Sequence, residues 1–436
     1  MRMSHDMGVL VVAALLLCGL WPGTGWGQDM SPDQAIRLSQ HMLQRHPQDA
    51  RAYYRLGDAY IQKARESGDI TYVTLAEQAL RKALDLAPRF SGAARHLAYV
   101  FYYRHAFEAA AAQAARAIEL DTGDSHAYGI LGDAYLEVGK YEQAQQAYQQ
   151  MMQLQGDLYA YSRLAGLKSL RGDTAGALED LERAVHEGQT HGRPQESIAW
   201  VQWQLGSEHF ALGHVQEAET QYLAALTSYP SYYRALAGLA QVRVAQQRYP
   251  EAITLYQQAI GIIPLPDYAG ALGDVYMKIG RPEEAQKQYD LVEYIGRLNA
   301  LNNVLYNREL AYFYADHDMK LQDSLALARK ELEVRRDIYA YDVLAWALYK
   351  NDRPQEALAA MTAALHLGTK DARLLFHAGM IHQRLGNTEP AQDYLRRALA
   401  TNPHFHIMHA DLANHTLKHL TGQLDPDPLR ERRDGQ

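Results

Sequence analysis

Five histidines near the C-terminus are the residues whose type and spacing come closest to a metal-binding or reactive site. They are His404, His406, His409, His415 and His419. His406 and His409 are three residues apart and His415 and His419 four apart, so each pair can share a helix face and could bridge a divalent cation. Histidines on a solvated helix are more often free of metal than bound to it, and no cysteine or tight carboxylate pair accompanies these. The sequence therefore predicts no metal site, and a metal-handling protein remains an alternative.

Motifs for catalysis are incomplete. "HEGQTH" (186–191) sets its histidines five residues apart instead of the four of H-E-x-x-H, and it contains Gly188. "HTLKH" (415–419) has the right histidine spacing, but Thr416 stands where the catalytic glutamate is needed. Neither G-x-G-x-x-G nor G-x-x-x-x-G-K-[ST] occurs, so the sequence has no recognisable phosphate-binding loop. We expect neither an enzyme nor a bound cofactor.

A recurring aspartate is the other chemically interesting feature, because Asp58, Asp133 and Asp274 each follow glycine in "LGD". An acid–base pair would need a second group at a fixed spacing from each aspartate, and no such group recurs. We therefore expect the aspartates to lie on the inner wall of the fold as hydrogen-bonding or partner-contacting groups.

The composition is that of a folded protein, with 436 residues, 47% hydrophobic and 22% charged. The formal net charge is −8, so the chain has no overall basic field to neutralise phosphates. Nucleic-acid binding depends on such contacts, and the sequence therefore argues against a nucleic acid as the main partner.

The first 27 residues differ from the rest. An apolar run over 7–21 follows Arg2, and Gly25 and Gly27 place small residues where a leader peptidase needs them. The run is shorter than the roughly 20 residues of a membrane-spanning helix. Residues 1–27 are therefore predicted to be a signal peptide cleaved before Gln28, and the protein is expected to be periplasmic or secreted.

Two other interpretations of this segment stay open. Asp6 weakens the positive charge that a signal peptide carries at its start, so the segment could remain as an inner-membrane anchor. Cys18 could carry a lipid, although Leu17 is bulky where a lipidation motif needs a small residue. Since Cys18 is the only cysteine, cleavage before Gln28 would leave no disulfide, cysteine-ligated zinc or cysteine nucleophile.

Internal repetition is the strongest signal in the sequence. "RLGDAY" (55–60), "ILGDAY" (130–135) and "ALGDVY" (271–276) are nearly identical, and weaker copies carry a small residue at the glycine position. The series is Gly57, Ala98, Gly132, Ala165, Gly206, Ala240, Gly273, Ala311, Ala345 and Gly379, at intervals of 33 to 41 residues, most often 34. A second small residue follows twelve positions later in most units, and a proline closes three of them.

This pattern resembles the tetratricopeptide repeat over residues 31–403, and the resemblance implies an all-α, right-handed superhelical solenoid of about ten helix-turn-helix units. In such a unit the small residue of the first helix lets the second helix approach closely. Tyr148, Tyr222, Tyr256 and Tyr289 are expected to fill the space between helices. Residues 404–420 are predicted to form a capping helix, and 421–436 a disordered tail.

The resemblance also implies where a partner would bind, because the first helix of each unit lines a concave groove in this family. Aromatic and arginine side chains there are typical of interface hot spots. The alternative is that many of them pack between helices. The candidate partner-binding residues are Tyr54, Arg95, Tyr99, Tyr102, Tyr103, Trp203, Phe210, Trp346 and Tyr349.

The function expected from this resemblance is a non-catalytic scaffold of the cell envelope that binds a partner peptide or helix in the groove. The Lys and Asn set that clamps a terminal carboxylate in some members is absent. The alternatives are an accessory or regulatory subunit of an envelope enzyme or transport complex and, less directly supported, a periplasmic metal-handling protein. The sequence does not indicate the oligomeric state, and membrane contact is expected only through an uncleaved or lipidated leader.

Overall fold

The described part of the chain is built from helices. The computed structural model describes residues 30–301 and 307–423, so the predicted leader, Cys18 and most of the tail lie outside them. The first helices are α1 Pro32–Arg45, α2 Ala50–Ser67, α3 Ile70–Leu86, α4 Ser91–Tyr103, α5 Phe107–Leu120, α6 Ser125–Glu137, α7 Tyr141–Leu154, α8 Leu158–Leu170, α9 Thr174–Thr190, α10 Gln195–Ala211 and α11 Val215–Ser228. The others are α12 Tyr233–Ala245, α13 Tyr249–Ile262, α14 Pro266–Lys278, α15 Pro282–Leu301, α16 Asn307–Asp316, α17 Leu321–Val334, α18 Ile338–Lys350, α19 Pro354–Ala364, α20 Ala372–Arg384, α21 Thr388–Thr401 and α22 His409–Leu420.

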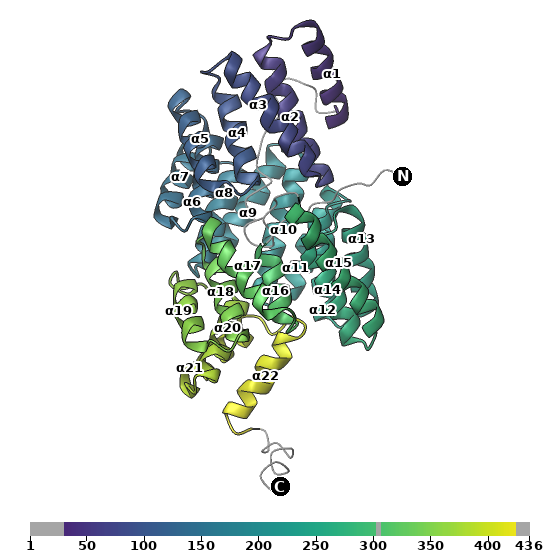
Figure 1. Cartoon of the computed structure of the whole chain (residues 1–436), viewed down its shortest axis with the longest axis vertical. Coiled ribbons are helices and arrows are strands. Elements are labelled where there is room, and N and C mark those ends of the chain that lie inside the picture. The colour runs from purple at the N-terminus through teal and green to yellow at the C-terminus, as the bar shows by residue number, and fades with distance from the viewer. Residues whose placement is uncertain (1–29, 302–306, 424–436) are drawn as a thin grey trace.

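Helices α2 to α21 form ten hairpins, each an even-numbered helix packed against the odd-numbered helix that follows it (Figure 1). The even-numbered helices also contact the next even-numbered helix in most of the array. A curved stack brings its inner helices closer together than its outer ones, so the even-numbered helices line the concave face. The predicted all-α solenoid is confirmed.

The glycine of the repeat allows the two helices of a hairpin to touch. A Cβ on Gly132 would lie 2.3 Å from Cε1 of Tyr148, and one on Gly273 would lie 2.3 Å from Cε1 of Tyr289. The same tyrosines donate their hydroxyl hydrogen to the aspartate after the glycine, Tyr148 to Asp133 over 3.0 Å. The small residue and the large ring thus form one complementary contact, which confirms the expected packing of glycine against tyrosine.

Carboxylates of the inner helices join one repeat to the next. Each accepts a hydrogen bond from, or pairs with, a basic side chain in, or directly after, the following even-numbered helix. The pairs are Asp58–His96, Asp133–Arg163, Asp274–His317 and Asp342–His377. The aspartates of "LGD" therefore hold the stack together, and Asp133 and Asp274 are buried.

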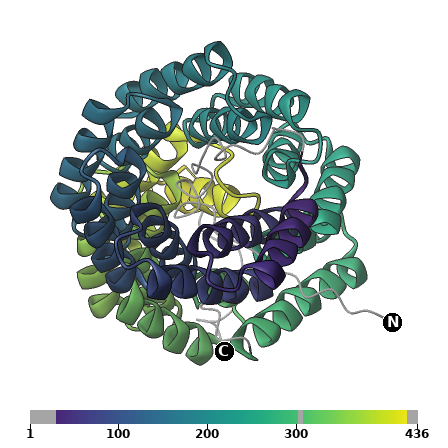
Figure 2. The ribbon, with the colours of Figure 1, turned by 90° about the horizontal axis from the view of Figure 1, so that it is seen from above.

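The superhelix completes a turn, and its later repeats lie against its earlier ones (Figure 2). The amide of Arg336 donates to the carbonyl oxygen of Glu137 over 2.9 Å, and Asn402 donates to the carbonyl oxygen of Phe210 over 2.7 Å. The partners are about 190 to 200 residues apart, which corresponds to roughly six repeats per turn. We call these contacts, together with the ion pairs described next, the inter-turn interface.

Turn glycines make this interface possible. Gly139 and Gly172 end the first helices of their hairpins with φ of +74°, a conformation that L side chains rarely adopt. A Cβ on Gly139 would also lie 2.5 Å from the carbonyl oxygen of Arg336, and one on Gly172 would lie 2.4 Å from that of Gly368. Both the backbone conformation and the close approach therefore require glycine.

Buried ion pairs reinforce the inter-turn interface. Arg335 Nε lies 2.6 Å from Glu137 Oε2, and its Nη1 lies 2.9 Å from Glu331 Oε1. Arg308 joins the same group, since its Nε lies 3.2 Å from Glu331 Oε1, and its Nη2 also lies 2.8 Å from Asp337 Oδ1. These side chains are almost completely buried. Each charge depends on its partners, because burial of an unpaired charge is strongly unfavourable.

The C-terminal segment turns inward after α21. The helix predicted over 404–420 begins at His409 and packs on α21. Its first residues also reach the inner helices: Lys278 Nζ of α14 lies 2.5 Å from Asp411 Oδ2, and the His409 ring lies 5.8 Å from that of Trp346 in α18. Seen along the long axis, α22 lies inside the ring of helices (Figure 2). No helix of the described part of the chain is long and apolar enough to span a membrane.

Candidate functional site

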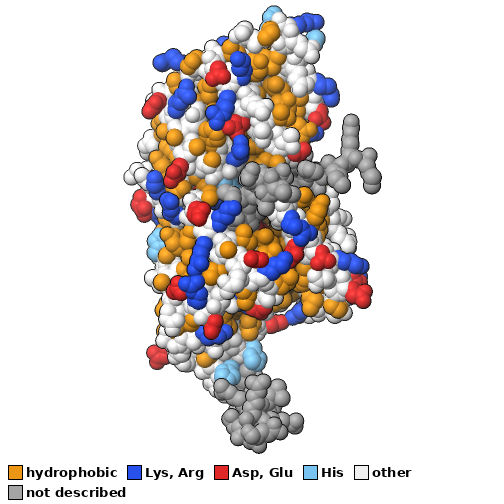
Figure 3. Space-filling model, viewed as in Figure 1, with side chains coloured by type: hydrophobic (Ala, Val, Ile, Leu, Met, Phe, Trp, Pro, Cys, Tyr) orange, Lys and Arg blue, Asp and Glu red, His pale blue; other side chains and the backbone are white. Residues whose placement is uncertain are grey.

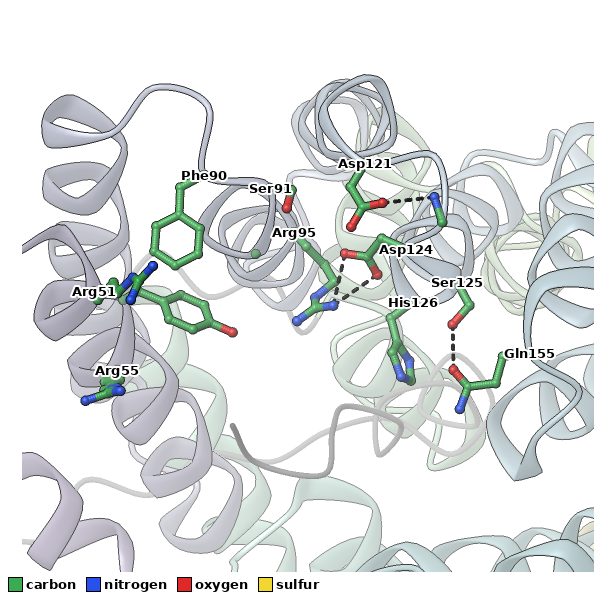
Figure 4. Close-up of a pocket in the computed structure, with 13 residues that line it drawn as sticks. Arg51, Arg55, Phe90, Ser91, Arg95, Asp121, Asp124, Ser125, His126 and Gln155 are labelled. Atoms are coloured by element: carbon green, nitrogen blue, oxygen red, sulfur yellow. Dashed lines mark hydrogen bonds and ion pairs between the residues drawn. The ribbon is translucent and has the colours of Figure 1, made fainter. Parts of the chain in front are cut away.

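The concave face contains a pocket of about 520 Å³ between the first turns of α2, α4 and α6 (Figure 4). The inner helices present their N-terminal turns here, so one wall comes from each of three consecutive repeats. The lining includes Arg51, Tyr54, Arg55, Phe90, Arg95, Asp121, Asp124, Ser125, His126 and Gln155. Two residues predicted from the sequence, Tyr54 and Arg95, lie in this pocket.

An ion pair forms the back of the pocket. Arg95 Nη1 lies 3.0 Å from each carboxylate oxygen of Asp124, and both side chains are buried. Asp124 also caps α6 by accepting a hydrogen bond from the amide of Ala127 over 3.2 Å. Arg51 and Arg55 stand across the cavity on α2, one exposed and one half-buried (Figure 4). The pocket thus has more guanidinium donors than carboxylates.

Aromatic rings form the other wall. Tyr54 and Phe90 have ring centroids 4.8 Å apart, and the Tyr54 ring meets His96 edge-on at 4.9 Å. Burial raises the pKa of Tyr54 to about 12, so its hydroxyl stays protonated. Burial likewise lowers the pKa of His126 to about 3, and the ring is therefore neutral near pH 7. Its Nδ1 is buried and has no hydrogen-bond partner among the described residues.

The other half of the concave face is covered by the chain itself. Trp346 of α18 is 1% exposed, and its ring stacks on His377 at 4.1 Å. Phe376 of α20 stacks on His409 at 4.8 Å and also contacts Phe405 at 5.5 Å. Residues 405–409 therefore occupy the groove over α18 and α20. Tyr349 is also buried and stacks on Trp346.

The remaining predicted residues are spread over the array. Tyr99 and Tyr103 are neighbours along α4, with tilted rings whose centroids lie 6.3 Å apart. Tyr102, one residue before Tyr103, points elsewhere: its hydroxyl donates to Glu137 over 2.8 Å in the inter-turn interface. Trp203 is buried beneath the guanidinium of Arg234. Partner binding by the nine residues stays a prediction, and the structure brings only Tyr54 and Arg95 into one pocket.

Phe210 differs from these residues, since it is half-buried and its carbonyl oxygen accepts the inter-turn hydrogen bond from Asn402. Its backbone therefore belongs to the inter-turn interface, whereas Trp203 lies about two turns earlier in the same helix.

Three segments match models of known repeats. Residues 204–267 and 343–404 match one tetratricopeptide repeat model, and residues 125–157 match another. These three segments are therefore similar to tetratricopeptide repeats. Such repeats are in general modules of protein–protein interaction and are typically not catalytic. The hairpins α6–α7, α10–α13 and α18–α21 lie in the matched segments.

Several solved structures are similar to this chain. YrrB, described as a TPR protein with an unusual peptide-binding site, is 20% identical with a TM-score of 0.29, over 43% of this chain and 94% of its own. The Cut9–Hcn1 hetero-tetramer of the APC/C is 14% identical with a TM-score of 0.32, and the match covers 88% of this chain and 93% of that one. Yeast Tom70 is 12% identical with a TM-score of 0.36, and the match covers 93% of this chain and 96% of Tom70. No curated protein matches the sequence.

The sequence did not predict most of the residues that line this pocket, because they lie outside the groove positions of the tetratricopeptide repeat. Phe90 and Gln155 lie in the turns between repeats, and His126 lies in the first turn of α6. The sequence contains one signal for this pocket, because Arg51, Arg55 and Arg95 lie in the first halves of two consecutive inner helices. On the face shown in Figure 3, basic and acidic side chains are interspersed and form no extended patch of one charge.

Proposed function

We propose that this protein is a non-catalytic scaffold that binds an extended segment of a partner protein in the pocket between α2, α4 and α6. The observation that carries the proposal is the combination of guanidinium donors with an aromatic wall in an open part of the concave face. Arginine forms bidentate hydrogen bonds with carboxylates, and tyrosine and phenylalanine provide contact area at low entropic cost. A volume of about 520 Å³ suits a few side chains of an extended segment.

The partner segment should carry an acidic side chain beside an apolar or aromatic one. Arg51 faces the cavity from α2, while Asp124 already neutralises Arg95. An acidic group therefore finds a guanidinium donor on the α2 side, and an apolar group packs against Phe90 and Tyr54.

We also propose that the protein works in the cell envelope, on the basis of the apolar run over 7–21 and the small residues that follow it. Cell fractionation with N-terminal sequencing tests this part separately. An N-terminus at Gln28 in the periplasmic or secreted fraction supports it, and an intact chain in the cytosol overturns it. An accessory role in an envelope enzyme or transport complex is the alternative, and it would appear as stable co-purification with one catalytic partner.

Binding of short peptides tests the pocket directly. Fluorescence anisotropy with octapeptides of defined sequence should show preference for acidic–aromatic over basic–aromatic peptides. The double charge reversal Arg51→Glu/Arg55→Glu should weaken the best peptide at least tenfold. The control is Arg183→Glu on the outer helix α9, where the side chain is 56% exposed and pairs with Glu179. Equal binding by the double variant, or preference for basic peptides, would refute the proposal.

A further inference from the structure

Three potential metal ligands converge where α22 enters the groove. Asp316 at the end of α16, His377 in α20 and His409 at the start of α22 each offer a ligand atom within 4.8 Å of the others. His377 and His409 are buried at 0% and 4% exposure. The three residues are far apart in sequence, so the cluster exists only because the chain end folds back onto the inner helices.

The orientation of His377 leaves one ring nitrogen available. Its Nδ1 lies 2.9 Å from Asp342 Oδ1, so Nδ1 carries the proton and donates it to that carboxylate. Its Nε2 is buried and has no hydrogen-bond partner among the described residues. A histidine that donates one nitrogen to a carboxylate and presents the other is the usual arrangement of a metal-binding imidazole. Tyr312 fixes Asp342 in turn, donating its hydroxyl hydrogen over 2.6 Å.

The other two ligands are also positioned. Trp346 Nε1 donates to Asp316 Oδ1 over 2.7 Å and so orients the carboxylate. His409 Nε2 lies 3.7 Å from the same oxygen, beyond hydrogen-bonding distance, and its Nδ1 has no partner in the described part of the chain. Two ligand atoms of one tetrahedral zinc ion are about 3.3 Å apart. Movements of about 1 Å by these side chains would therefore bring their ligand atoms to coordination distance.

We propose that Asp316, His377 and His409 form a binding site for a divalent cation of the zinc type, with water as a fourth ligand. Two imidazoles and a carboxylate suit Zn²⁺ better than Mg²⁺ or Ca²⁺, which prefer oxygen ligands. The neighbouring His406 is not a ligand, because its Nδ1 accepts the amide hydrogen of Met408 and its Nε2 lies 3.8 Å from Asp274.

The consequence of the site is a link between α22 and the array. Two ligands belong to the inner helices α16 and α20, and the third belongs to the segment that covers the groove. A bound cation would therefore hold residues 405–409 over Trp346 and Phe376, and its loss would make this half of the groove easier to open. The inference is independent of peptide binding in the pocket between α2, α4 and α6.

Zinc binding by the purified full chain tests the site. After treatment with EDTA and removal of the chelator, calorimetry with ZnCl₂ should show one equivalent bound. His409→Gln and Asp316→Asn should each weaken binding at least tenfold. The matched control is His415→Gln, an exposed histidine on the same helix α22, which should bind like the unaltered chain. Because His409 lies outside the ten hairpins, circular dichroism should show that its variant keeps the array.

Hydrogen exchange of α22 provides the second readout. Zinc should slow exchange of the amides over 409–420 at least tenfold in the unaltered chain and in His415→Gln, and should leave His409→Gln unchanged. The histidines could instead only pack against Trp346 and Phe376. In that case no zinc would bind at tens of micromolar, or His409→Gln would bind as tightly as the unaltered chain, and either result overturns the proposal.

Discussion

The two halves of the concave face are built from the same kind of hairpin and differ in what covers them. Between α2, α4 and α6 the inner helices leave a pocket of about 520 Å³. Between α14 and α20 the groove is occupied by residues 405–411, which contact Trp346 and Phe376 and pair with Lys278. The fold alone therefore does not make a binding site, since a segment added after the last repeat decides which part of the groove is accessible.

The chemistry of the two halves differs as well. The open pocket presents guanidinium groups and a neutral histidine, whereas the covered half gathers carboxylates and histidines. The inter-turn interface joins the two halves, because Glu137 belongs to α6 and Arg335 directly follows α17. Substitutions in the inter-turn interface and in the hairpins test features that both halves share. Substitution of a buried acid tests a feature that distinguishes the two halves.

The largest effect is expected from Glu137→Ala, which should lower the free energy of unfolding by about 3–5 kcal/mol. The substitution removes the carboxylate that Arg335 Nε contacts at 2.6 Å and leaves a buried guanidinium short of a partner. Chemical denaturation measures the loss. Glu142→Ala in α7 is the control, because that side chain is 80% exposed and should change stability by less than about 0.5 kcal/mol. Equal losses would show that the halves are not joined here.

A smaller effect tests what the two halves share. Gly132→Ala in the first half and Gly379→Ala in the second should each cost about 1–3 kcal/mol, since the new Cβ would meet Tyr148 at 2.3 Å or Leu395 at 2.7 Å. The control is Gly166→Ala in α8, where a Cβ meets no atom within 4 Å. That change should stabilise the helix by about 0.5–1 kcal/mol. Thermal denaturation checks all three, and a stabilising Gly132→Ala would contradict the packing described.

The last effect concerns pH. Burial, with the charges of Asp267 and Glu331, raises the pKa of Glu309 in α16 to about 8. Between its ordinary pKa of 4.5 and this value the folded state keeps a proton that the unfolded state loses, so stability falls as pH rises. The slope should be on the order of 1 kcal/mol per pH unit from pH 5 to 8. Glu309→Gln should make it shallower, while Glu333→Gln, an exposed control, should not.

The open pocket should not contribute to this pH dependence. The pKa of His126 is about 3 and that of Tyr54 about 12, so neither group changes charge between pH 5 and 8. Peptide binding there should consequently stay constant over this range apart from the titration of the peptide. Denaturation curves at pH 5 and pH 8 that coincide for the unaltered chain would contradict the assignment of Glu309.

The repeat architecture was predictable because it is local. The glycine at 132 and the tyrosine at 148 lie within one hairpin, and the interval of about 34 residues repeats their relationship along the chain. The burial of Trp346 was not predictable in this way. The groove position was identified from the repeat, but the segment that covers the ring lies some 60 residues later and has no repeat pattern of its own.

Long-range contacts explain the other differences. The spacing of the histidines within 404–420 indicates only pairs that share one helix face. His409 instead lies near Asp316 and His377, which come from different repeats. The inter-turn interface likewise depends on the curvature of the whole stack, which places Glu137 beside Arg335 although 198 residues separate them. The composition of the sequence and the spacing of its motifs do not indicate that curvature.

A cross-linking measurement tests most directly that the chain covers one half of its own groove and leaves the other open. In a chain with Cys18→Ser, cysteines replace Lys278 and Asp411, whose side chains meet at 2.5 Å. A short bis-maleimide should join them in most molecules, while the pair at Arg51 and Asp411 should remain unlinked. Failure of the 278–411 pair to link, or equal linking of both pairs, would contradict the account.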